Sequence, residues 1–184
     1  MNTYQTELSL LCRVIANKTR LQLLWKVFQE EELSVQDLAI QTGTSEQNAS
    51  NQLRILAAKE LIHPYRRNRE VFYKPARPST ERVRILLPVL KTCHAQEISF
   101  QVIVHQATAF THERRIQIAR CLVASDETFE SLLKKTGMTT PSQNRHLRKL
   151  LRRNVIRKQS KAYQLCEPDS KLSQCLLKLA TKSD

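Results

Sequence analysis

The 184-residue chain contains only two glycines, Gly43 and Gly137, and they lie 94 residues apart. At the same offset, Thr-Gly, Leu-Arg and a closing Leu recur within residues 41–56 and 135–150. Glycine adopts positive φ without strain and is therefore common just after the end of a helix. A hydroxyl residue after each glycine can cap the next helix. The candidate caps are Thr44, Ser45, Thr139 and Thr140. The repeat predicts a helix-turn-helix in each half of the chain.

The helix expected after Gly43 has an apolar face and a polar face. Ala49, Leu53 and Leu56 share one side at helical spacing. The other sides carry amides, hydroxyls and a guanidinium, which are groups that reach base edges in a major groove. A solvated polar face is the alternative interpretation of the same pattern.

Charge favours a nucleic-acid partner over a purely solvated face. The chain has 30 lysines and arginines against 17 acids, a net charge of +13 and a pI near 9.9. Such an excess suits a polyanion, although a basic protein can also be merely soluble or bind a membrane surface. Residues 111–161 hold thirteen bases and four acids, whereas residues 17–74 hold nine and seven. We therefore expect the second copy to hold a phosphate backbone more strongly than the first.

Two short apolar segments after the first helix-turn-helix predict a β-hairpin at residues 61–66 and 70–74. Its tip carries Arg67 and Arg69, which would lie beside a phosphate backbone or enter a minor groove. Pro64 predicts an edge strand. In the second copy a shorter hairpin is expected around Ser160 and Lys161.

The predicted fold is mainly α with small β-hairpin wings. Tandem winged helix-turn-helix domains, residues 1–92 and 93–184, would be joined by a long central helical region at about 79–109. No Gly- or Ser-rich linker separates the copies, so we expect a fixed mutual geometry.

Several classes of protein are not expected. The N-terminus lacks a signal-peptide pattern and no apolar run of 18 residues occurs, which predicts a soluble, cytosolic protein without a membrane span. The five cysteines are odd in number and form no CxxC pair, so a disulfide framework is not expected and most should be reduced core residues. No catalytic set stands out, and two glycines do not build a phosphate-cradling loop, so we expect no enzyme activity.

Both copies resemble the winged helix of the arsenical-resistance-repressor (ArsR) family of bacterial transcription regulators. The matching residues are 16–21, 32–39, 45–56 and 59–62 in the first copy and, most densely, 139–150 in the second. The resemblance implies recognition helices that begin near Thr44 and Thr139. It also implies that the first and last helices of each domain form a dimer interface, within an intrachain pseudo-dimer or a homodimer. The implied location is the bacterial cytoplasm, at the nucleoid.

The sequence departs from the family in its metal sites and in its duplication. Ser34 and Gln36 occupy the positions of the thiol pair of metal-sensing members, and neither is a useful soft-metal ligand. His94 and His105 lie three helical turns apart without carboxylate or thiol partners. No metal site or other cofactor is therefore expected. Gln143 stands at the inward position that Ala49 fills in the first copy.

The leading hypothesis is a sequence-specific regulator of transcription, such as a repressor, that binds double-stranded DNA with both recognition helices in major grooves. The expected base-contacting residues are Gln47, Asn48, Ser50, Asn51, Ser142, Asn144 and Arg145. Expected phosphate or minor-groove contacts are Arg54, Arg67, Arg69, Arg148, Arg152 and Lys161. Arg145 is the best candidate for a bidentate contact to guanine. Because the two helices differ, the two half-sites should differ. The alternatives are a plasmid replication or partition protein, and a winged-helix interaction scaffold that does not bind nucleic acid.

Overall fold

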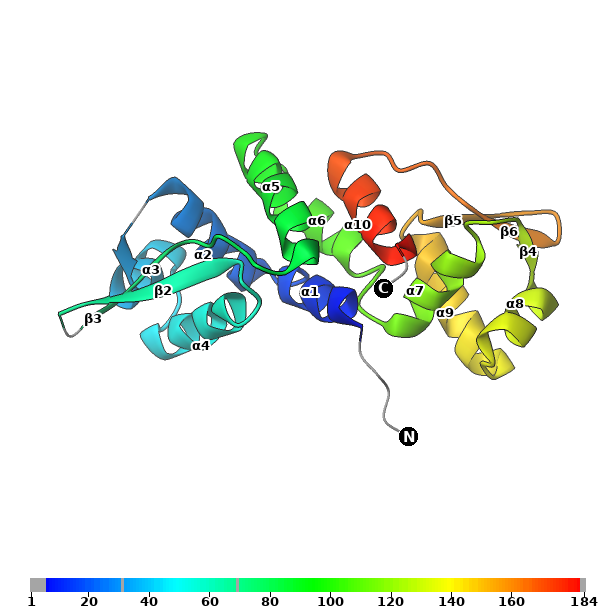
Figure 1. Cartoon of the computed structure of the whole chain (residues 1–184), viewed down its shortest axis with the longest axis horizontal. Coiled ribbons are helices and arrows are strands. Elements are labelled where there is room, and N and C mark those ends of the chain that lie inside the picture. Colours follow the sequence, from blue (N-terminus) through cyan, green and yellow to red (C-terminus); the bar gives the residue numbers. More distant parts are fainter. Residues whose placement is uncertain (1–5, 31, 69, 183–184) are drawn as a thin grey trace. The chain divides into compact units, whose positions relative to one another are not determined.

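The computed structural model describes residues 6–30, 32–68 and 70–182, which form ten helices and two three-stranded antiparallel sheets. The elements follow the same order in both halves of the chain (Figure 1). The first series is α1 (Glu7–Ile15), α2 (Lys18–Gln29), β1 (Leu33–Ser34), α3 (Val35–Thr42), α4 (Glu46–Ala57), β2 (Ile62–Arg67), β3 (Glu70–Pro75) and α5 (Glu81–Ala95). The second is α6 (Phe100–Ala107), α7 (Glu113–Cys121), β4 (Glu127–Thr128), α8 (Phe129–Thr136), α9 (Thr140–Arg152), β5 (Ile156–Gln159), β6 (Ala162–Leu165) and α10 (Lys171–Thr181).

The turns between α3 and α4 and between α8 and α9 have the expected backbone. Gly43 has φ 63° and Gly137 has φ 62°, in the left-handed region, and each ends the preceding helix. Ser45 caps α4 by accepting a hydrogen bond from the backbone of Asn48. Thr139 is the N-cap residue of α9 without a side-chain hydrogen bond. The paired glycines therefore do predict the two helix–turn–helix segments.

Each sheet has one strand more than the expected hairpin. Leu33 of β1 pairs with Tyr73 of β3, and the strand order is β1-β3-β2. Pro64 accordingly lies in the edge strand β2, as predicted. The second sheet repeats the arrangement in the order β4-β6-β5, with Glu127 paired to Tyr163.

The central helical region consists of two helices, α5, which closes the first series, and α6, which opens the second. Helix α5 ends at a turn in which Glu97 has φ 53°, and the backbone of Ile98 donates to the carbonyl of Cys93 at 2.9 Å. Helix α6 starts only at Phe100. Pro88 lies exposed within α5.

The described chain divides into two compact units, residues 17–104 and residues 1–16 with 105–184. This division differs from the expected domains 1–92 and 93–184 because α1 belongs to the unit of the second series. Nε of Arg13 in α1 donates to the carbonyl of Thr111 at 2.9 Å, and Leu11 and Ile15 are fully buried. The other boundary falls inside α6. Within the described ranges, every helix is too short or too polar to traverse a lipid bilayer.

Candidate nucleic-acid interface

Helix α4 presents three of its five candidate residues to solvent. Gln47, Asn51 and Arg54 are exposed, whereas Asn48 and Ser50 are partly buried. The guanidinium of Arg54 donates to the side-chain oxygen of Asn51 at 2.9 Å, so these two side chains form one polar group on the surface. The inward face consists of Ala49, Leu53 and Leu56, as expected.

The side-chain amide of Asn48 forms hydrogen bonds within its own compact unit. Its nitrogen donates to Oγ1 of Thr44 at 2.7 Å, and its oxygen accepts from Nε2 of Gln52 at 3.1 Å. Gln52 in turn accepts a hydrogen bond of 2.7 Å from Nη1 of Arg20 on α2. This chain of amides joins α4 to α2, so Asn48 is a weaker candidate for base contact than Gln47 or Asn51.

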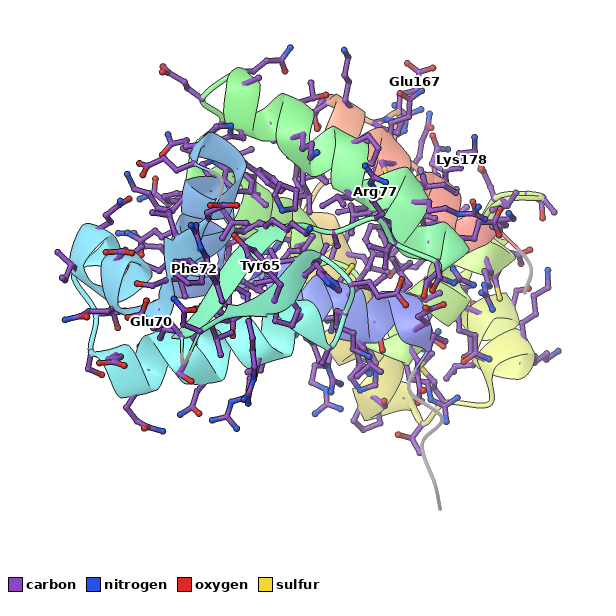
Figure 2. All side chains as sticks on the ribbon, turned by 60° about the vertical axis from the view of Figure 1, so that its left-hand side comes forward. Tyr65, Glu70, Phe72, Arg77, Glu167 and Lys178 are labelled. Atoms are coloured by element: carbon purple, nitrogen blue, oxygen red, sulfur yellow. The ribbon has the colours of Figure 1, made fainter. Side chains whose placement is uncertain are left out.

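The β2–β3 hairpin extends past the ends of α3 and α4 (Figure 1). Arg67 is exposed and forms an ion pair with Glu32 at 3.3 Å. Arg69 lies outside the described residues. Tyr65 and Phe72 stack side by side on the hairpin, with ring centroids 5.8 Å apart (Figure 2). The stacked rings stiffen the strand that carries Arg67.

Helix α9 carries the strongest concentration of positive charge among the candidate surfaces. Arg145, Arg148 and Arg152 are all exposed, and their spacing of three and four residues places them along one helical stripe. Asn144 is also exposed, whereas Ser142 is partly buried. Lys161 is exposed in the turn between β5 and β6. The α4 and α9 sets belong to different compact units.

Sequence reasoning missed a basic hollow beside the α9 stripe, with a cavity volume of about 430 Å³. Its lining residues come from the start of α7 and from α9. They are His112, Arg115, Arg145, His146, Arg148, Lys149 and Arg152. His146 is buried with 3% of its surface exposed, and its ring centroid lies 4.5 Å from that of His112. A signal was present in the sequence, because His146 follows Gln143 by three residues on the inward face of the helix.

Burial shifts the pKa values of the titratable side chains in this hollow. Burial, then the neighbouring His112 and Arg115, lower the pKa of His146 from 6.5 to about 4. Burial likewise lowers the pKa of Arg115 to about 10 and moves the pKa of His112 below its usual value. His146 is therefore a neutral imidazole at pH 7, with one donor and one acceptor nitrogen.

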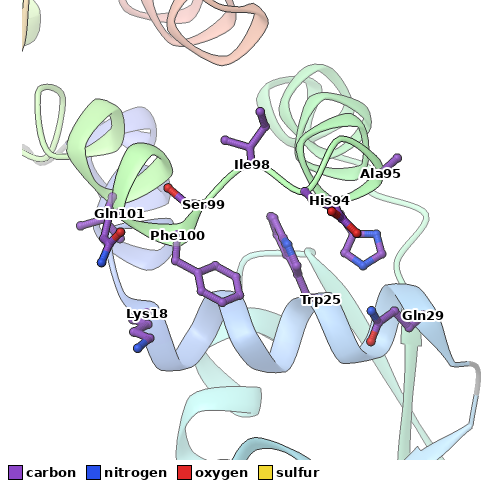
Figure 3. A pocket seen from close by; sticks show the side chains of 11 residues that line it. Lys18, Trp25, Gln29, His94, Ala95, Ile98, Ser99, Phe100 and Gln101 are labelled. Carbon is purple, nitrogen blue, oxygen red and sulfur yellow. The ribbon is translucent and has the colours of Figure 1, made fainter.

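A second hollow, of about 690 Å³, lies in the unit of residues 17–104. Trp25 from α2 and Phe100 from α6 point into it, with His94 of α5 beside Trp25 (Figure 3). The ring centroid of Trp25 lies 5.8 Å from that of Phe100 and 5.6 Å from that of His94. Lys18 and Gln29 supply polar groups at its edge. The surface is aromatic and differs in character from the basic hollow at α9.

No match was found when the chain was compared with protein-family models, with curated proteins and with solved structures. Within the described ranges, no three His, Cys, Asp or Glu side chains gather as ligands of a metal ion would. All five cysteines are free thiols, and Cys12, Cys93 and Cys175 are buried.

Proposed function

We propose that the protein is a tandem winged-helix regulator of transcription that binds double-stranded DNA in a sequence-specific way. In this proposal α4 and α9 are the recognition helices and enter major grooves, and the hairpins β2–β3 and β5–β6 are the wings. The series of helices, glycine turn, helix and hairpin in each half supports this assignment.

The observation that carries the proposal is the exposed stripe of Arg145, Arg148 and Arg152 on α9. A helix of about 10 Å diameter fits the major groove, which is about 12 Å wide. Arg145, near the N-terminal part of the helix, is the residue that we assign to bidentate contact with guanine. Arg148 and Arg152 lie further along the helix and we assign them to phosphates.

In the first copy we assign base contacts to Gln47 and Asn51 and phosphate contacts to Arg54 and Arg67. Asn51 and Arg54 are already joined by a hydrogen bond, which orients both side chains before DNA arrives. Two unlike recognition helices would read two unlike half-sites, about 34 Å apart along one turn of duplex.

One chain carries both recognition helices, so in this proposal the protein binds DNA as an intrachain pseudo-dimer or as a homodimer. Helix α1 opens the first series but packs in the unit of the second series, where Arg13 bonds to Thr111. Each half of the chain thus contributes to the core of that unit. A single chain would then present both recognition helices.

The test is the salt dependence of binding to duplex DNA. Neutralising about six phosphates should give a slope of about −5 in a plot of log affinity against log salt concentration. A matched variant with Arg148→Gln and Arg152→Gln should reduce the magnitude of that slope by about 2. A flat response in the wild-type chain would contradict DNA binding and favour an interaction scaffold.

A further inference from the structure

The basic hollow at α7 and α9 holds polar atoms that the protein itself does not satisfy. Neither ring nitrogen of His146 has a hydrogen-bond partner among the described residues, although both atoms are buried. Nε of Arg153, about two helical turns further along the chain, is also buried without a partner, although Arg153 does not line the hollow. A buried polar group without a partner costs about 1–3 kcal/mol. Such atoms are expected where a bound group supplies the missing hydrogen bonds.

The floor of the hollow is held in place by backbone carbonyls. Arg115 is buried, with 8% of its surface exposed. Its Nε donates to the carbonyl of Ala109 at 2.6 Å, and its Nη2 donates to the carbonyl of Thr108 and to Oγ1 of Thr111. These bonds do not use Nη1. The guanidinium is therefore fixed in position and keeps donor capacity.

The side chains at the mouth of the hollow have the same sign of charge. Arg145, Arg148, Lys149 and Arg152 occupy one stripe of α9 above the partly buried His112 and the buried His146. Burial and the nearby arginines lower the pKa of Lys149. Mutual repulsion of this kind is relieved when an anion enters.

We infer that this hollow is a binding site for a phosphate group, with Arg115 and His146 at its floor and Lys149 and Arg152 around the anion. The chemistry is that of a phosphate or similar tetrahedral oxyanion, since guanidinium, ammonium and imidazole groups converge on one small space. The cavity volume of about 430 Å³ exceeds that of one such group, which leaves room for a small phosphorylated molecule.

Occupation of the site is coupled to proton uptake. The titratable and charged groups around the two imidazoles and Arg115 come from three helices. They are Cys12 and Arg13 from α1, His112, Glu113, Arg114 and Arg115 from the start of α7, and Arg145, Arg148, Lys149, Arg152 and Arg153 from α9. Most are cationic and disfavour the imidazolium form of His146. A bound anion offsets that repulsion, so affinity rises as the pH falls towards about 5.

In the experiment, the full chain is titrated by calorimetry in the absence of DNA. One titration uses inorganic phosphate at pH 7, and a second series uses sulfate at pH 5, 6 and 7. Sulfate stays fully ionised over this range, so any pH dependence comes from the protein. The variants are His146→Leu and Lys149→Gln, with Lys171→Ala as the control that removes an exposed charge of α10, outside the hollow. We expect one site per chain and sulfate binding that tightens as the pH falls. His146→Leu and Lys149→Gln should each weaken binding by about tenfold or more, and Lys171→Ala should change little.

Two results would overturn the site. One is the absence of saturable binding by phosphate or sulfate. The other is an equal loss in all three variants, which would indicate general attraction to a positive surface. If His146→Leu does not fold, as judged by circular dichroism, Lys149→Gln decides.

A second arm identifies the source of the phosphate. If the DNA backbone fills the hollow, inorganic phosphate competes with duplex at constant ionic strength and Lys149→Gln weakens duplex binding. If a free small molecule fills it, Lys149→Gln leaves duplex affinity unchanged. The phosphate titration needs no DNA, so failure of the DNA-binding proposal would leave its result intact.

Discussion

Gln143 of helix α9 donates a hydrogen bond from its side-chain nitrogen to the backbone carbonyl of Phe129, the first residue of helix α8, at 2.7 Å. The side-chain oxygen of Gln143 accepts from Oγ1 of Thr136 at 3.3 Å, and the side chain is fully buried. The departure from the small Ala49 of the first copy thus has a structural reason, because this amide joins the two helices of the second helix-turn-helix.

Replacing Gln143 should therefore loosen that pair of helices. Gln143→Ala leaves a small cavity and removes a partner from buried groups, so the free energy of unfolding should fall by about 1–3 kcal/mol. Asn144→Ala, at the exposed neighbour, should change it by less than about 0.5 kcal/mol. Urea unfolding of both variants measures the difference. Equal stability of the two would contradict the role given to the amide.

Both turns have room for a side chain at the glycine position, but their backbone conformation is strained for residues other than glycine. A Cβ at Gly43 or Gly137 would meet no atom within 4 Å, so a substitution costs only the strain of positive φ. Gly137→Ala should lower the free energy of unfolding by about 1–2 kcal/mol. Gly137→Asn should lower it less, because asparagine tolerates the left-handed region. A larger loss for Asn than for Ala in thermal unfolding would contradict this explanation.

Glu60 should stabilise the start of α5 in a pH-dependent way. Its carboxylate accepts hydrogen bonds from the backbone nitrogens of Ser79 and Thr80 at 2.6 and 3.0 Å, and from both hydroxyls. These donors, Thr80 first, lower the pKa of Glu60 to about 2. A lowered pKa means stability that is present above pH 4.5 and lost as the pH falls towards 2. Glu60→Gln should lower the Tm at pH 7, and the difference from wild type should shrink in that acidic range.

His146 should make the protein less stable in mild acid. Its pKa is about 4 in the folded chain and 6.5 for the ordinary group, so the unfolded chain takes up the proton first. The free energy of unfolding should therefore fall by up to about 3 kcal/mol between about pH 6.5 and pH 4. His146→Leu should flatten this part of the profile and raise stability, since it removes two buried nitrogens without partners. His63→Gln, exposed on β2, is the control. A wild-type slope retained in His146→Leu would rule out this residue as its source.

Arg145 and Lys161 should differ in what they contribute to DNA binding. Arg145→Ala should weaken binding to the preferred duplex by about 1–3 kcal/mol and relax the preference at one base position. Lys161→Ala should weaken all duplexes alike, because it contacts phosphate in our proposal. Fluorescence anisotropy with a preferred and a random duplex separates the two. Equal losses on both duplexes for Arg145→Ala would refute base contact by this residue.

Local rules predict much of the fold from the sequence. Asn17 caps α2 and Ser34 caps α3, as their side chains and spacing indicate, and both glycines end helices. The inward and outward faces of α4 and α9 also follow from helical periodicity, and Asn51 and Arg145 are exposed. These features depend on neighbours within one or two turns of the chain.

The features that the sequence did not predict depend on partners far along the chain. Strands β1 and β4 have two residues each, too few for an alternating pattern, and form by pairing with β3 and β6. The N-cap residue of α5 is Thr80, which makes no side-chain capping bond, and the distant Glu60 accepts hydrogen bonds from the backbones of Ser79 and Thr80. The basic hollow arises where α7 meets α9, which no local pattern contains.

Selection of bound duplexes from a random pool tests the central claim most directly, since it measures whether two unlike helices read two unlike sequences. We expect an enriched motif with two different half-sites separated by about one turn of duplex. We also expect Arg145→Ala to remove base preference in one half-site and Asn51→Ala to remove base preference in the other. A selected pool with no sequence enrichment over the starting pool would contradict it.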